Sequence, residues 1–215
     1  MEYTIRRMHG TPALPLARNL EFFPDGLAAP WSALEEAEIG VYPWDETGYR
    51  PQSRARLGWT PDGLYVLMYS REKEIRAEET RIGGGVYNDS CLELYIGELN
   101  NPIYFNFECN PIGAMFIGIG ADRQNREVLQ AYPEGMRVAT GMHRGGWWAV
   151  SYFVPAAFLK LRGNLTLAEG EELRGNFYKC GDKTAALHHG MWNAVEWPMP
   201  DFHRPEHFGK IRVGA

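Results

Sequence analysis

Residues 103–110 read Ile-Tyr-Phe-Asn-Phe-Glu-Cys-Asn, and this stretch indicates the fold class. Apolar residues recur at every second position, which is the period of a β-strand with one buried face. The apolar residues, which we predict to face the core, are Ile103, Phe105, Phe107 and Cys109. The residues between them, which we predict to face the other way, are Tyr104, Asn106, Glu108 and Asn110. Such alternation is typical of an antiparallel sheet that packs one face on a core.

The preceding stretch, residues 91–96, alternates in the same way. Its predicted inward residues are Leu92, Leu94 and Ile96, and its opposite face carries Cys91, Glu93 and Tyr95. Because only Asn-Asn-Pro separates the two strands, we expect them to pair as a hairpin with Glu93 and Glu108 on one face. Carboxylates, carboxamides and aromatic rings suit the hydroxyl groups and the apolar face of a sugar. The same alternation is also typical of an ordinary solvated sheet face.

Similar short apolar runs, separated by turn-forming residues, extend along the chain. They predict strands near residues 53–60, 63–70, 91–97, 103–110, 113–119, 136–142, 147–154, 173–181, 192–197 and 208–213. Helical signals are limited to residues 31–38 and 155–160. This pattern indicates an all-β fold, an antiparallel β-sandwich of jelly-roll type with one or two short helices. No repeat or change of composition interrupts residues 1–215, so we expect a single domain.

The composition narrows the classes of function. Hydrophobic residues make up 45% of the 215 residues and charged residues 23%, values that exclude a disordered or fibrous chain. The formal net charge is −5 without a basic cluster, so nucleic acid is not an expected partner. No segment approaches the roughly 20 apolar residues of a membrane span, and the first residues do not resemble a signal peptide. We expect no membrane partner, and a monomer or weak dimer.

Three cysteines, Cys91, Cys109 and Cys180, each lie in an apolar, strand-like run. Their number is odd and their spacing matches neither a disulfide framework nor a known metal motif. We therefore expect three buried thiols in a reducing compartment, and this favours a cytoplasmic location.

Four stretches of the chain match motifs of one known family. They are residues 55–69 (ARLGWTPDGLYVLMY), residues 86–96 (VYNDSCLELYI), residues 104–113 (YFNFECNPIG), and Trp197 with residues 202–211 (FHRPEHFGKI). In this order they resemble the opening strands, the Asp-Ser segment, the strand that follows it and the closing signature of family 9 carbohydrate-binding modules. The resemblance covers residues 20–213 and implies a jelly-roll sandwich that binds a sugar without cleaving it.

The resemblance also implies roles for particular residues. Two aromatic rings sandwich the sugar in the family, and the matching positions are Tyr87 and Phe202, with His203 beside the latter. Glu93 matches a sugar-binding Glu, and Asn106 stands where the family has an Arg. Together with the strand pattern and a possible pocket wall, the predicted ligand-binding residues are Tyr87, Glu93, Asn106, Glu108, Asn110, Trp197, Phe202 and His203. A small carbohydrate is the predicted partner.

Other interpretations remain open from the sequence. Glu93 and Glu108 could form the acid/base pair of a glycoside hydrolase, although nothing indicates the unequal environments that such catalysis needs. A haem-binding or redox-partner sandwich is a further alternative. Arg123 and Arg126 either reach the rim of a site or belong to a solvated loop. The resemblance makes a structural calcium ion possible, but the candidate oxygen donors are scattered over Asp45, Glu46, Asp62, Asp89 and Asp182.

Overall fold

The computed structural model describes residues 1–14, 26–143 and 145–215. Most of the sequence resemblance lies within these ranges, but residues 20–25 lie outside them. The strands are β1 (Glu2–Arg7), β2 (Ala37–Glu38), β3 (Gln52–Thr60), β4 (Gly63–Arg71), β5 (Cys91–Glu98), β6 (Tyr104–Cys109), β7 (Met115–Gly120), β8 (Arg126–Val128), β9 (Arg137–His143), β10 (Trp147–Pro155), β11 (Glu172–Cys180), β12 (His189–Met191) and β13 (Gly209–Val213). The helical elements are the 3₁₀ turns η2 (Trp31–Ala33), η3 (Val86–Asn88) and η4 (Pro205–His207) and the helix α1 (Ala156–Gly163).

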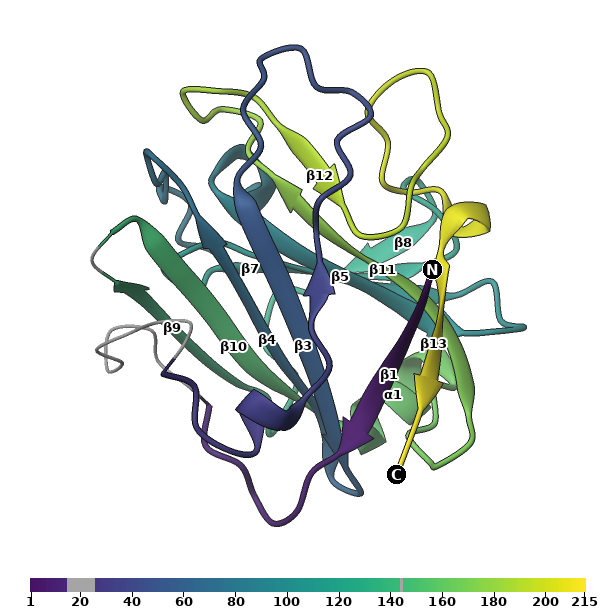
Figure 1. Ribbon diagram of the computed structural model, residues 1–215. Helices are drawn as coiled ribbons and strands as arrows, with labels where there is room; N and C mark the ends of the chain where they lie inside the picture. Colours follow the sequence, from purple (N-terminus) through teal and green to yellow (C-terminus); the bar gives the residue numbers. More distant parts are fainter. Residues whose placement is uncertain (15–25, 144) are drawn as a thin grey trace.

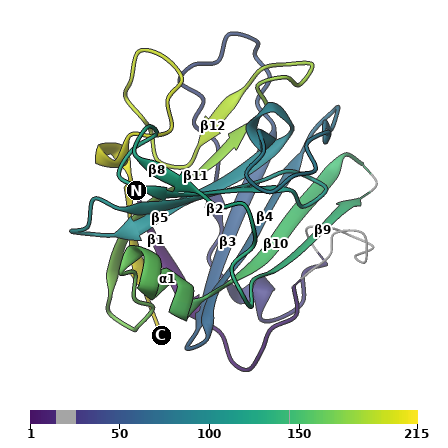
Figure 2. The ribbon, with the colours of Figure 1, turned by 180° about the vertical axis from the view of Figure 1, so that it is seen from behind.

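The strands form a β-sandwich of two layers (Figures 1 and 2). One layer runs in the order β8-β7-β6-β5-β11-β13-β1, and the other in the order β1-β3-β4-β10-β9. Strand β1 belongs to both, because its first residues pair with β13 and its last two pair with β3. The fold class expected from the sequence is confirmed, except that β1 runs parallel to both neighbours in an otherwise antiparallel arrangement.

The main core lies between the layers and is built from the inward-facing residues of the alternating strands. Leu92, Leu94, Phe105, Phe107 and Cys109 are all completely buried there, as the two-residue period predicts. Burying an aromatic or aliphatic side chain of this size contributes about 1.5–3 kcal/mol to the stability of the folded state. This packing fixes which side chains point away from the core, and so it positions the site described below.

Two predicted elements are wrong. Residues 192–197 form a loop after β12 rather than a strand. The chain bends there because Trp192 packs into the main core against Phe177, whereas Val195 belongs to a different cluster beyond the sheet. Residues 31–38 form only the turn η2 and the two-residue strand β2, which pairs with the edge of β3. In addition, the sequence did not predict strands β1, β2, β8 and β12. Strand β1 connects the two layers, β8 lies at the end of one layer, and β2 and β12 pair with β3 and β11.

The described residues contain no helix that is both long and apolar enough to cross a membrane.

Candidate functional site

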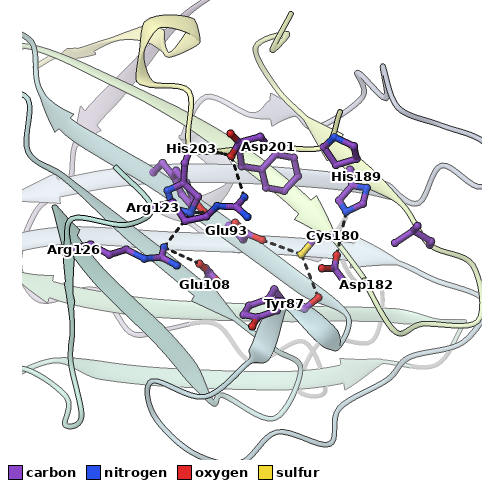
Figure 3. A pocket seen from close by; sticks show the side chains of 14 residues that line it. Tyr87, Glu93, Glu108, Arg123, Arg126, Cys180, Asp182, His189, Asp201 and His203 are labelled. Atoms are coloured by element: carbon purple, nitrogen blue, oxygen red, sulfur yellow. Dashed lines mark hydrogen bonds and ion pairs between the residues drawn. The ribbon is translucent and has the colours of Figure 1, made fainter. Parts of the chain in front are cut away.

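A cavity of about 540 Å³ lies on the face of β5, β6 and β11 that points away from the main core. Figure 3 shows Tyr87 on one side of it and Asp201 and His203 on the other, with Glu93 and Glu108 between them. Its lining residues come from several strands and loops and are Tyr87, Glu93, Tyr95, Glu108, Arg123, Arg126, Cys180, Asp182, Leu187, His189, Pro200, Asp201, Phe202 and His203. Segments far apart in the sequence therefore meet at one place.

Glu93 and Glu108 form the floor of this cavity, and we refer to them as the carboxyl pair. They are direct register partners in the β5–β6 hairpin, so the predicted pairing is confirmed. Their side chains are not on an open surface, however, because the residues are only 2% and 3% exposed. A second apolar cluster, which includes Val86, Met191 and Phe202, covers this face of the sheet. The alternative interpretation, an ordinary solvated sheet face, is therefore wrong.

Each member of the carboxyl pair has one oxygen with a partner and one without. Glu93 Oε1 accepts a hydrogen bond from the Cys180 thiol at 2.9 Å, and Glu108 Oε1 accepts one from Asn106 Nδ2 at 2.7 Å. The Oε2 atoms of both residues are buried and have no hydrogen-bond partner among the described residues. Buried polar atoms are seldom left unpaired, since each costs about 1–3 kcal/mol. The two oxygens are therefore candidates for contact with a ligand.

Burial raises the pKa of Glu93 to about 7, because the ionised carboxylate has lost its water. Burial also raises the pKa of Glu108 well above its usual range, and the neighbouring Glu93 carboxylate raises it further. The Arg126 guanidinium, 4.0 Å from Glu108 Oε1, opposes this shift only in part. The carboxyl pair therefore holds a proton near neutral pH, and it can both donate to and accept from a hydroxyl group.

Arg126 is the main cation near the floor. It extends from β8 across β7, where Gly118 lies beneath it, and donates to Asn106 Oδ1 at 3.3 Å. A Cβ atom at position 118 would lie 2.1 Å from Asn106 Oδ1 and 3.2 Å from Arg126 Cδ, so glycine makes room for both side chains. Arg123 lies on the rim and donates to Asp201 at 3.0 Å. The sequence left open whether these two arginines reach the rim of a site or belong to a solvated loop. The structure places both of them at the cavity.

His203 holds Arg126 in position. Arg126 Nη1 lies 3.0 Å from His203 Nε2, and the Tyr95 hydroxyl lies 3.1 Å from the same nitrogen. Because Arg126 can only donate, Nε2 is the acceptor, and Nδ1 carries the hydrogen that it donates to the Tyr104 hydroxyl at 2.7 Å. Burial, with the charge of Arg126, lowers the pKa of His203 to about 3. The imidazole is therefore neutral and acts as a fixed acceptor.

Two of the predicted aromatic residues line the cavity in different ways. Phe202 is 7% exposed and stacks on Tyr178 with the ring centroids 4.0 Å apart, so its ring is rigidly supported. Tyr87 lies in η3 and is 42% exposed. Its backbone is anchored, because its carbonyl oxygen accepts a hydrogen bond from the Asp182 amide at 3.0 Å. The phenol ring itself is therefore available to a ligand.

Three predicted site residues do not line the cavity. Asn106 lies behind the floor, where it links Glu108 to Arg126. Asn110 donates to Asp89 at 2.9 Å and to the Glu79 carbonyl at 2.8 Å, so its carboxamide stabilises the loop that precedes β5. Trp197 lies outside, with the Arg204 guanidinium 3.5 Å from its ring centroid. The alternation along a strand predicts on which face of the sheet a side chain lies. It does not predict which neighbours form hydrogen bonds with the polar groups of that side chain.

The acids considered for calcium do not gather into one site within the described ranges. Asp45 accepts from Arg50 and two backbone amides, and Asp89 accepts from Asn110 and the amides of residues 78 and 79. Asp182 lies 3.1 Å from His189. These three carboxylates therefore already have hydrogen-bond or ion-pair partners within the protein. A structural calcium ion stays a prediction from the resemblance alone.

The fold has known structural relatives. The chain has a TM-score of 0.78 and 23% identity to a candidate carbohydrate-binding protein from Bacteroides uniformis ATCC 8492, covering 99% of this chain and 98% of the other. For a family 9 carbohydrate-binding module from Caldicellulosiruptor kristjanssonii in complex with cellotriose, the TM-score is 0.68 and the identity 12%, and the match covers 100% of this chain and 94% of the other. For a family 9 module from the same organism in complex with glucose, the TM-score is 0.66 and the identity 13%, and the match covers 99% of this chain and 96% of the other.

At these identities, the structural matches establish the fold alone. No curated protein sequence matches the chain. The model of carbohydrate-binding family 9, by contrast, matches residues 28–213, which include every element that lines the cavity. Proteins of this family bind carbohydrate and are not catalytic. The chain therefore belongs to carbohydrate-binding family 9.

Proposed function

We propose that the cavity binds one unit of a small carbohydrate, with the carboxyl pair as the polar floor and Tyr87 and Phe202 as aromatic walls. The observation that carries this proposal is the pair of buried Oε2 atoms without partners among the described residues, on two residues that line a cavity large enough for a small ligand. Adjacent hydroxyl groups of a sugar can supply hydrogen bonds to two neighbouring carboxyl groups. A bound sugar would thereby satisfy both oxygens at once.

The charges around the floor support a neutral, hydroxyl-rich ligand. Arg126 is near Glu108, Arg123 is paired with Asp201, and Asp182 is near His189. Because each rim charge already has a partner, a strongly charged ligand would have to break these pairs. A sugar needs only donors and acceptors, and the arginines and the carboxyl pair provide both.

The aromatic residues support the same class of ligand. The face of a sugar ring that carries C–H groups is apolar, and a flat ring is a suitable partner for it. Phe202 is held by Tyr178, and Tyr87 is exposed at the cavity. The structural neighbours include modules bound to cellotriose and to glucose, which supports a small sugar as ligand here too.

Isothermal titration calorimetry with a panel of mono- and disaccharides, including glucose, tests this proposal on the full chain. We expect binding in the micromolar to millimolar range, about −4 to −8 kcal/mol, because the cavity accommodates a small ligand with few contacts. Lack of heat for every sugar, with the protein shown to be folded by circular dichroism, would contradict the proposal. Turnover of an aryl-glycoside panel would instead favour the hydrolase alternative.

A further inference from the structure

Two of the three cysteines meet beside the carboxyl pair. Cys91 begins β5, Cys180 ends β11, and the two residues are direct register partners. Glu93 lies two residues after Cys91, so both side chains are on the cavity face of β5. One ligand atom from each of these three residues lies within 4.8 Å of the others. Within the described ranges, no other group of three His, Cys, Asp or Glu side chains meets this criterion.

The spacing of these atoms is close to that required by a single metal ion. Zinc holds thiolate sulfur at about 2.3 Å and carboxylate oxygen at about 2.0–2.2 Å, so tetrahedral ligand atoms lie about 3.5–3.8 Å apart. Cys180 Sγ and Glu93 Oε1 are 2.9 Å apart, and all three atoms lie within 4.8 Å. Small side-chain rotations would therefore bring the ligands to zinc distances. All three residues belong to paired strands, which restricts their positions.

The charge balance of the cluster is compatible with a divalent cation. The Cys180 thiol donates a hydrogen bond to Glu93 Oε1. With the proton of the carboxyl pair on Glu108 and Glu93 ionised, a divalent cation would displace one proton from each thiol into solvent and form two metal–sulfur bonds and one metal–oxygen bond. The net charge of the cluster would then be unchanged. Added net charge is costly at a buried site, so a balanced exchange is important here.

Access to the three residues is from the cavity. Cys180 and Glu93 line it, whereas Cys91 is completely buried behind them. An ion held by three protein ligands would keep its fourth position open toward the cavity, as zinc does in sites that bind an exogenous ligand. Two thiolates also favour zinc over the oxygen-preferring calcium or magnesium.

We propose that Cys91, Glu93 and Cys180 form a binding site for a zinc-class divalent cation, with an open coordination position that faces the cavity. This site goes beyond the proposed sugar binding and does not depend on it. Only Glu93 Oε1 is needed for the metal, so Glu93 Oε2 remains available to a hydroxyl group.

Titration of the reduced, chelator-treated full chain with Co²⁺ tests the site, because cobalt bound to thiolate gives a charge-transfer band in the near ultraviolet. We expect the band to saturate at one equivalent of Co²⁺ and to disappear when Zn²⁺ displaces the cobalt. Absence of the band at saturating Co²⁺ would overturn the proposal. Binding through histidine alone, which gives no thiolate band, would overturn it as well.

Cys109 provides a matched control, since it is also completely buried but lies on the opposite face of the sheet, in the main core. We expect Cys180→Ala and Cys91→Ala to lose the band and to weaken Co²⁺ binding at least 100-fold, whereas Cys109→Ala keeps both. An equal loss in all three variants would overturn the proposal. If a cysteine variant does not fold, Glu93→Gln decides: it must weaken Co²⁺ binding at least tenfold, and unchanged affinity would refute the ligand set.

Discussion

Buried carboxylates lie on both sides of strand β11 and differ in how completely their oxygens are paired. Between the layers, Glu72 has partners for both oxygens: Trp148 at 2.6 Å and Lys179 at 3.2 Å on Oε1, and Ser90 at 2.9 Å on Oε2. We refer to this group as the Glu72–Lys179 cluster. On the cavity face, the carboxyl pair leaves one oxygen of each residue without a partner among the described residues.

Lys179 and Cys180 show how closely the two clusters lie. They are consecutive in β11, so their side chains point to opposite faces, Lys179 toward Glu72 and Cys180 toward Glu93. In the first cluster a buried cation matches a buried carboxylate, and His188 Nε2 accepts a further hydrogen bond from the ammonium group at 2.7 Å. Complete pairing indicates a structural role, whereas incomplete pairing at a cavity indicates a binding role.

The largest effect is expected from breaking the Glu72–Lys179 cluster. Glu72→Gln leaves the Lys179 ammonium buried without a carboxylate, and such a change typically costs about 3–5 kcal/mol of unfolding free energy. Urea denaturation measures this loss. The double variant Glu72→Gln/Lys179→Met removes the charge and should recover most of the stability. A double variant as unstable as the single one would show that packing, not charge, dominates this cluster.

The carboxyl pair should respond in the opposite way. Glu108→Gln replaces one carboxyl oxygen with an amide NH₂ group. We expect sugar affinity to fall about 10- to 100-fold, because a buried polar group left without its partner costs about 1–3 kcal/mol. Stability should be unchanged or higher, because a buried ionisable group is lost. Calorimetry with the best ligand of the sugar panel and urea denaturation measure the two effects.

Glu127→Gln is the matched control for Glu108→Gln, because Glu127 is exposed, is paired with Arg162 and is not part of the cavity lining. It should leave sugar affinity unchanged. If both variants weaken binding equally, the effect comes from net charge and not from the carboxyl pair.

The carboxyl pair should also make the stability of the protein depend on pH. The folded-state pKa of Glu93 is about 7, above its unfolded value near 4.5. Its contribution to stability is therefore fully present below pH 4.5 and is lost as the pH rises through about 7. In the presence of a chelator, we expect the free energy of unfolding of Glu93→Gln to rise relative to that of the natural chain between pH 5 and pH 8, by up to about 3 kcal/mol. Urea denaturation at the two pH values measures it, and a constant difference would argue against the shifted pKa.

The smallest expected effect concerns the aromatic wall. Tyr87→Ala should weaken sugar binding at least tenfold, about 1.4 kcal/mol, without unfolding the protein. Tyr132→Ala is a suitable control, because both tyrosines are 42% exposed but only Tyr87 lines the cavity. Calorimetry compares the two variants. Equal affinity of Tyr87→Ala and the natural chain would remove this residue from the site.

Local patterns predicted much of the fold. Nine of the ten predicted strands exist with their ends within two residues, because alternation and turn residues act over short distances. The same alternation placed Glu93 and Glu108 side by side. It could not predict β1, whose parallel pairing with β3 and β13 joins segments more than 50 residues apart in the sequence.

The site was predicted only in part, for a similar reason. Tyr87, Glu93, Glu108, Phe202 and His203 do line the cavity. Arg126 was left undecided, because its role depends on β8 lying next to β7 and on the space above Gly118. Tyr95 and Cys180 lie on predicted strands, and their parity relative to Glu93 was the signal that could have added them.

The two-residue period of each strand can be read from the amino-acid sequence, and it fixes which side chains share a face with Glu93 and Glu108. The enclosure of this face depends on the folded chain, because the covering segments around residues 86–88 and 189–203 reach it through long-range packing. Enclosure removes water from the carboxyl pair, raises both of their pKa values and leaves two oxygens in need of a partner. A pattern of residue types carries no information on that loss of water, which is why the chemistry of the site emerged only from the fold.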